Sequence, residues 1–117
     1  MNILISLFSV IILISINIIF SYKENKFYWL YEASHFVGGF LLAALFLNFF
    51  DRKLILLFVL TTSILWEVYE FLINKNIKIK KYLENNFRYY VTPPIFSDTV
   101  LDILLSVLGA VFYLYLF

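Results

Sequence analysis

The chain has 117 residues, of which 63% are hydrophobic and 15% are charged, and its formal net charge is +1. Soluble domains average about 45–50% apolar and about 25% charged residues, and a domain of this size buries too little surface to hide such an excess, so the composition argues against a water-soluble fold. The chain has no cysteine, and this absence excludes disulfides, thiolate zinc sites and cysteine nucleophiles.

Four apolar segments predict the fold. The first covers residues 2–22, carries no charged side chain and spans about 30 Å as a helix. A cleavable signal peptide is the alternative, but the segment lacks a basic N-terminal region and a small-residue cleavage site. Segments 33–50, 54–73 and 99–117 are also long enough to cross a bilayer, and lipid favours helices because it cannot satisfy open backbone groups. We therefore expect an all-α fold, a single transmembrane domain over residues 1–117 that forms a bundle of four transmembrane helices.

The connections between these segments differ in character. Residues 23–32 are polar and aromatic, residues 51–53 form a tight turn, and residues 74–98 form a long basic loop. The basic residues of the long loop are Lys75, Lys78, Lys80, Lys81 and Arg88. They alternate with aliphatic and aromatic residues, which is typical of a segment at a membrane surface. The proline pair at 93–94 ends any helix before it. We expect this loop to contact the bilayer and anionic lipid headgroups, and we expect no nucleic-acid partner.

The distribution of Lys and Arg predicts the orientation in the cell membrane. The first and third loops together hold seven of these residues, and the turn between the second and third helices holds two. Positive residues favour the cytoplasmic side, so the first and third loops are expected there and both termini on the outer side.

Ionisable residues near the ends of the predicted spans define a candidate polar site. These residues are His35, Glu67, Glu70, Asp98 and Asp102. The third helix runs opposite to the second and fourth, so all five are brought to the membrane side that carries the basic loops. Gly39 and Ala43 follow His35 at intervals of four, which predicts that another helix approaches the second one closely. The expected result is a polar pocket at the cytoplasmic edge of the bundle.

Carboxylates and one imidazole suit a divalent metal such as Mg, Mn or Fe, with Glu67, Glu70 and Asp102 as the expected ligands. Two alternatives stay open. Some carboxyl groups are protonated, or Arg88 and Lys75 from the adjoining loop compensate their charge.

Several of these residues also have structural interpretations. Asp98 is as well suited to capping the last helix as to binding a ligand, and His35 is able simply to hydrogen-bond a carboxylate. Glu32, one turn before His35, is expected to stay solvated. Trp66 is expected to belong to an aromatic belt at the membrane interface.

The order of these polar residues resembles the VanZ-like family of small membrane proteins. That family has a His near the start of a span, a Glu followed three residues later by Gln, an Arg in the next loop, and Asp, Asn and Gly in a DxxxNxxG pattern. The matching residues are His35, Glu67, Glu70, Arg88, Asp102, Ser106 and Gly109. Glu70 stands in place of Gln and Ser106 in place of Asn. The similarity covers residues 33–112 and implies an envelope protein with a polar site at the cytoplasmic edge, without a defined reaction.

Three functions follow as hypotheses. The first is a VanZ-like envelope protein whose polar pocket binds an anionic lipid headgroup. The second is a metal-dependent membrane enzyme that acts on a phosphorylated lipid, in which the carboxylates hold the ion and His35 or Asp98 transfers protons. The third is a small proton or cation transporter, for which a homo-oligomer would supply the polar path that the outer half of a single bundle lacks.

Overall fold

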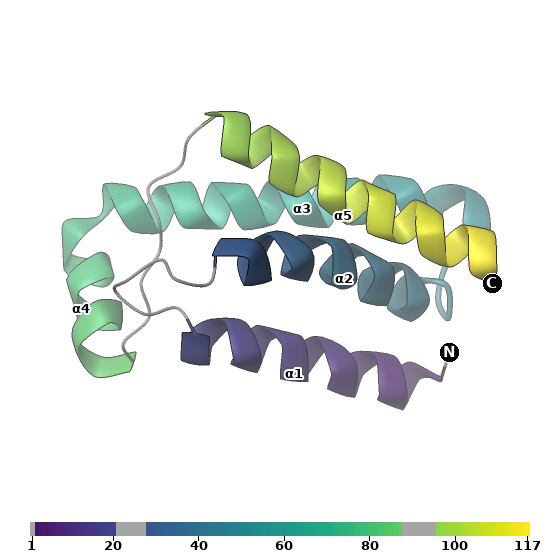
Figure 1. Ribbon diagram of the computed structural model, residues 1–117, viewed down its shortest axis with the longest axis horizontal. Helices are drawn as coiled ribbons and strands as arrows, with labels where there is room; N and C mark the ends of the chain where they lie inside the picture. Colours follow the sequence, from purple (N-terminus) through teal and green to yellow (C-terminus); the bar gives the residue numbers. More distant parts are fainter. Residues whose placement is uncertain (1, 21–27, 88–95) are drawn as a thin grey trace.

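The computed structural model describes residues 2–20, 28–87 and 96–117, and every regular element among them is helical. The helices are α1 (Ile3–Phe20), α2 (Tyr28–Phe46), α3 (Arg52–Lys75), α4 (Ile77–Phe87) and α5 (Phe96–Leu116). Four of them lie side by side, and the short α4 lies across one end of the bundle (Figure 1). Two of the described helices, α3 and α5, are long and apolar enough to cross a membrane, whereas α1 and α2 contain shorter apolar stretches.

The helix boundaries differ from the predicted ones chiefly in the connections. α2 begins at Tyr28, inside the predicted first loop, and ends at Phe46, where residues 47–50 turn instead of continuing the predicted span. The prediction of a loop throughout 74–98 is wrong, because α3 continues to Lys75 and residues 77–87 form α4. A single residue separates these two helices. Asn76 ends α3, and its Oδ1 accepts hydrogen bonds from the backbone N–H groups of Lys78 and Ile79, so it caps α4.

The contact between α2 and α5 is exceptionally close, and two glycines make it so. A Cβ atom added to Gly39 would collide with the backbone carbonyl group of Ser106, and one added to Gly109 would collide with that of Phe36. Small residues at such a crossing let two helix backbones touch, which gives van der Waals contact that lipid cannot replace. The close approach predicted from the spacing of Gly39 and Ala43 is therefore confirmed, and α5 is the neighbour.

The apolar core lies between α2, α3 and α5. Its buried members are Ala43, Ala44, Ile55, Val59, Ala110 and Tyr113. Phe40 packs edge-on against Tyr113, with ring centroids 5.0 Å apart, a favoured geometry for aromatic pairs. At the same end the guanidinium group of Arg52 donates a hydrogen bond to the carbonyl oxygen of Leu114, which joins the start of α3 to the end of α5.

The outer surface of the bundle is apolar. Among the described residues, α1 contacts α2 and no other helix. Its remaining faces expose aliphatic and aromatic side chains, including Leu4, Phe8 and Ile19, which are 74%, 66% and 70% exposed. Soluble monomers rarely expose apolar patches of this extent, so this surface is typical of a helix in contact with lipid.

Candidate functional site

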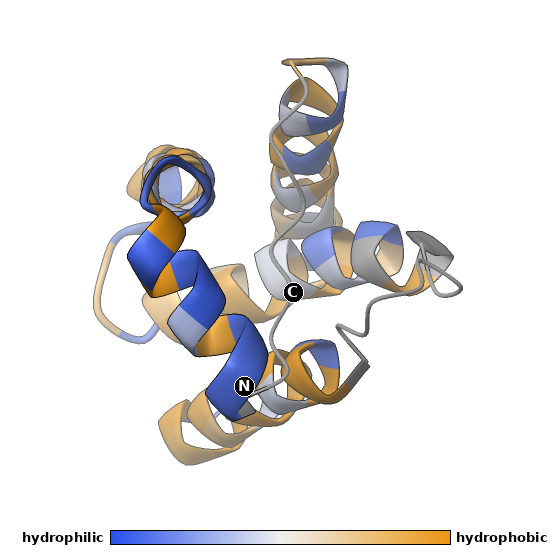
Figure 2. Cartoon of the chain, turned by 90° about the vertical axis from the view of Figure 1, so that its left-hand side faces the viewer, coloured by the Kyte–Doolittle hydropathy of each residue, from blue (hydrophilic) through white to orange (hydrophobic). Residues whose placement is uncertain are grey.

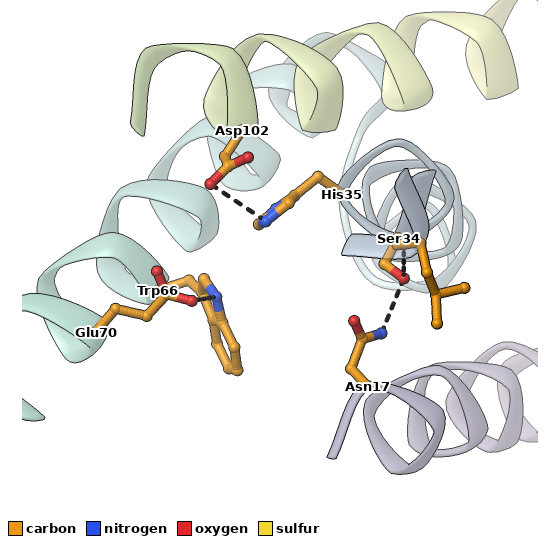
Figure 3. A network of polar contacts seen from close by, with 7 residues as sticks. Asn17, Ser34, His35, Trp66, Glu70 and Asp102 are labelled. Atoms are coloured by element: carbon orange, nitrogen blue, oxygen red, sulfur yellow. Dashed lines mark hydrogen bonds and ion pairs between the residues drawn. The ribbon is translucent and has the colours of Figure 1, made fainter. Parts of the chain in front are cut away.

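Three helices bring a histidine and two carboxyl groups together. His35 lies in the second turn of α2, Glu67 in the second half of α3 and Asp102 in the second turn of α5. The Nε2 atom of His35 lies 3.4 Å from Oδ2 of Asp102 (Figure 3). One potential ligand atom from each of the three residues lies within 4.8 Å of the other two. We call these three residues the His–Glu–Asp triad.

The α2–α5 contact explains why His35 and Asp102 meet. Gly39 follows His35 by one helical turn, and Ser106 follows Asp102 by one helical turn. Because Gly39 touches the backbone at Ser106, the side chains one turn earlier on both helices are also held close together. On α3, the buried Ser63 precedes Glu67 by one turn, so the face that packs inward carries Glu67 into the same space.

The triad is mostly shielded from solvent. The side chains of His35 and Asp102 are 21% and 14% exposed, and Glu67 is 9% exposed. The carboxyl group of Glu67 lies close enough to the side chains of Asp102 and Thr99 to interact with both. Two carboxyl groups in contact repel unless a proton or a cation lies between them, and the imidazole of His35 lies within reach of the same pair.

Glu70 and Asp98 lie at the edge of the triad. Glu70 Oε1 accepts a hydrogen bond of 2.9 Å from the indole Nε1 of Trp66 (Figure 3). Glu70 is therefore not in the triad, which differs from the predicted ligand set of Glu67, Glu70 and Asp102 by having His35 in its place. Asp98, in the first turn of α5, is half-buried and close enough to Asp102 to interact with it electrostatically.

Two residues near the site have contacts that the sequence analysis did not anticipate. Glu32 was expected to stay solvated, and this prediction is wrong. Its Oε2 atom is buried without a hydrogen-bond partner in the described structure, and the residue interacts electrostatically with Asp102. Its position one turn before His35, on the same face of α2, was the available signal. Trp66 was assigned to an aromatic belt, and its hydrogen bond to Glu70 gives it a second contact at the site.

A separate polar contact joins α1 to the helix that carries His35. The side-chain amide of Asn17 donates a hydrogen bond of 2.9 Å to the hydroxyl oxygen of Ser34 (Figure 3). Ser34 directly precedes His35. The contact therefore fixes α1 against the end of α2 that carries the triad.

The predicted basic residues are divided between two helices. Lys75 ends α3, and Lys78, Lys80 and Lys81 lie on α4. Lys80 Nζ donates a hydrogen bond of 3.0 Å to Oδ1 of Asn74. Arg88 lies outside the described residues.

Comparison with known proteins gives a family. A family model described as a predicted membrane protein (DUF2238) matches residues 1–117, the whole chain. No curated protein and no solved structure matches the chain at a significant level. Membership of the VanZ-like family stays a prediction.

Proposed function

The chain belongs to the DUF2238 family of predicted membrane proteins, and we propose that it is a multi-pass protein of the cell membrane that binds one divalent metal ion. The four spans of this proposal are α1, α2, α3 and α5. Their length and hydropathy support α3 and α5. For α2 the support is its position against α3 and α5, and for α1 it is its position against α2 (Figure 1) and its apolar exterior.

The observation that carries the metal proposal is the geometry of the His–Glu–Asp triad. Carboxylate oxygens suit Mg²⁺ and Mn²⁺, and an imidazole nitrogen suits transition metals such as Fe²⁺. A set that combines the two favours Mn²⁺ or Fe²⁺ over Mg²⁺. A divalent ion would also balance the charge of Glu67 and Asp102, two carboxyl groups that a largely buried site would otherwise hold together at a considerable cost.

The number of ligands favours a second, more specific function. Structural metal sites are usually closed by protein ligands, whereas catalytic sites keep a position for substrate or water, and the triad supplies only three ligands. We therefore propose a metal-dependent enzyme that acts on a phosphorylated lipid as the chemistry this site suits best. The ion would stabilise charge on the phosphoryl group, and Glu32 or Asp98 would transfer protons.

The proposal also includes an orientation. The basic residues of α4 and of the first loop support a cytoplasmic position for the triad end of the bundle. The start of α1 and the end of α5 lie together at the opposite end, which then faces outward (Figure 1).

Elemental analysis of the detergent-purified protein tests the metal site. After washing with a mild chelator, we expect a near-stoichiometric amount of Mn or Fe in the wild type. Glu67→Gln and Asp102→Asn keep the size of each side chain but remove its charge, so we expect the metal to be lost from both. Glu70→Gln is the matched control because Glu70 lies one turn from Glu67 but is hydrogen-bonded to Trp66.

Each outcome decides between two interpretations. Absence of metal from the wild type, even after incubation with Mn²⁺ or Fe²⁺, would overturn the proposal and leave a proton-sharing polar network. If the wild type binds metal and Glu70→Gln removes it as completely as Glu67→Gln does, the assignment of the ligands is wrong. Gel filtration in detergent, run on every variant, separates loss of metal from loss of the fold.

A further inference from the structure

A groove lies between the C-terminal end of α3 and α4, farther along α3 than Glu67 of the triad. It has a volume of about 830 Å³ and is open to the surroundings. Its lining residues include Leu72, Lys75, Ile77, Lys78, Ile79 and Leu83. Most of these side chains are aliphatic, and the two charged ones are both lysines. The groove does not include any residue of the His–Glu–Asp triad.

The walls of the groove are fixed relative to each other. Asn76 is the only residue between α3 and α4; its backbone N–H bonds the carbonyl of Leu72, and its side chain caps α4. The hydrogen bond from Lys80 to Asn74 adds a second connection between the two helices. Lys75 and Lys78, three residues apart across this turn, are therefore held near the same end of the groove.

The two faces of α4, one apolar and one polar, indicate that the groove lies at a membrane surface. On α4, Ile79, Tyr82 and Leu83 share one side of the helix, and Lys81 and Asn85 lie on the opposite side. Ile79 and Tyr82 are nonetheless 48% and 59% exposed. Figure 2 looks onto this end of the bundle and shows the mostly hydrophilic α4 crossing it in front of largely hydrophobic helices. A short helix with these two faces is typical of one that lies in the plane of a membrane surface.

From these observations we infer that the groove binds one anionic phospholipid. One of its acyl chains would lie against Leu72, Ile79 and Leu83, and its phosphate would lie between Lys75 and Lys78. The charge selects this occupant over the alternatives. A zwitterionic lipid gains less from two ammonium groups, and a second copy of the chain would bring a further pair of lysines against the first. The inference needs the chain to be in a membrane, but it does not depend on the metal.

Lipid retention after extraction from defined vesicles tests the inference. The protein is reconstituted into vesicles of equal parts phosphatidylglycerol and phosphatidylcholine, extracted in detergent, washed, and its bound lipid is measured by mass spectrometry. We expect the wild type to retain close to one phosphatidylglycerol per chain, enriched about tenfold or more over phosphatidylcholine. The double variant Lys75→Ala, Lys78→Ala removes the phosphate contacts, so we expect it to lose that enrichment.

The matched control removes the same charge from the same helix region but outside the groove. Lys80→Gln, Lys81→Ala takes two positive charges from α4, keeps an amide donor for Asn74 at position 80, and changes no residue that lines the groove. We expect this control to keep the enrichment. Equal loss in both double variants would overturn the inference in favour of diffuse attraction of the basic surface to the membrane. Equal retention of the two lipids by the wild type would overturn it as well.

A second variant tests the apolar wall. Ile79→Ser keeps both lysines but removes an aliphatic side chain that lines the groove. We expect it to retain less of both lipids while keeping the preference for phosphatidylglycerol. Unchanged retention would contradict the placement of the acyl chain. Circular dichroism and gel filtration in detergent establish that each variant is folded.

Discussion

The helices α2, α3 and α5 pack through small and aliphatic side chains such as Ala44, Ile55 and Ala110 at the end of the bundle where α1 starts and α5 ends. At the other end the same three helices enclose the His–Glu–Asp triad. The first end gains contact area that lipid cannot provide, whereas the second end holds polar groups that are costly in such surroundings. The apolar end and the glycine crossing therefore stabilise the bundle, whereas the polar end is the costly part that the proposed metal ion would stabilise.

The glycine crossing gives the largest expected effect. Gly39→Ala would place a Cβ atom against the backbone of Ser106, which cannot move aside as a flexible side chain would. We expect a loss of at least about 3 kcal/mol of stability, or failure to accumulate, when thermal unfolding is followed in detergent.

The neighbouring residue provides a control for this change. A Cβ atom on Gly38 would lie 3.6 Å from Cδ2 of Leu13, an ordinary van der Waals contact. We expect Gly38→Ala to be neutral or stabilising by up to about 1 kcal/mol, because alanine favours helix over glycine. If the two variants unfold at the same temperature, α2 and α5 are not in the close contact described.

Metal addition gives an intermediate effect confined to the polar end. A ligand that binds only the folded state at about 100 times its dissociation constant stabilises that state by about 2.7 kcal/mol. We expect Mn²⁺ to raise the thermal midpoint of the wild type and to leave that of Glu67→Gln unchanged. A matching rise in both proteins would show that the ion acts elsewhere than at the triad.

The hydrogen bond between α1 and α2 gives the smallest effect. Replacing Asn17 by Leu removes the donor to Ser34 and puts an apolar side chain with the same branching in its place. Hydrogen bonds between membrane helices average about 0.6 kcal/mol, so we expect a destabilisation of roughly this size in the same unfolding measurement. Ser15→Ala is the control, because the Ser15 hydroxyl bonds the carbonyl of Ile11 within α1, and we expect almost no change. A larger loss in Ser15→Ala than in Asn17→Leu would contradict this ranking.

Local rules predicted some elements better than others. Helical character over the four apolar segments follows from hydropathy and from the backbone's need for hydrogen bonds in lipid. The helix α4 was missed because its apolar residues recur over only 11 residues and alternate with lysines. Its start depends on the Asn76 cap, whose geometry depends on where α3 ends. The Pro93–Pro94 pair, which was expected to end any helix before it, lies outside the described residues.

The candidate site was also predicted only in part. Antiparallel helices and their spacing placed His35, Glu67 and Asp102 at one end of the bundle, because position along a helix follows directly from sequence number. Which of the carboxyl groups meet depends on rotation about each helix axis. Glu70 is only three residues from Glu67, yet it bonds Trp66, while Glu32 buries one carboxylate oxygen and interacts electrostatically with Asp102.

The sequence by itself determined that this protein is helical and apolar, and that its ionisable groups gather near one end, since these properties depend on composition and on regular helical rise. Only the tertiary structure decided which groups form the triad and how α4 closes the groove with α3. Whether His35 and Asp102 meet depends on how closely α2 and α5 approach, and that distance is set at Gly39 and Gly109, where one backbone touches another. The groove depends instead on Asn76, which ends α3 and caps α4.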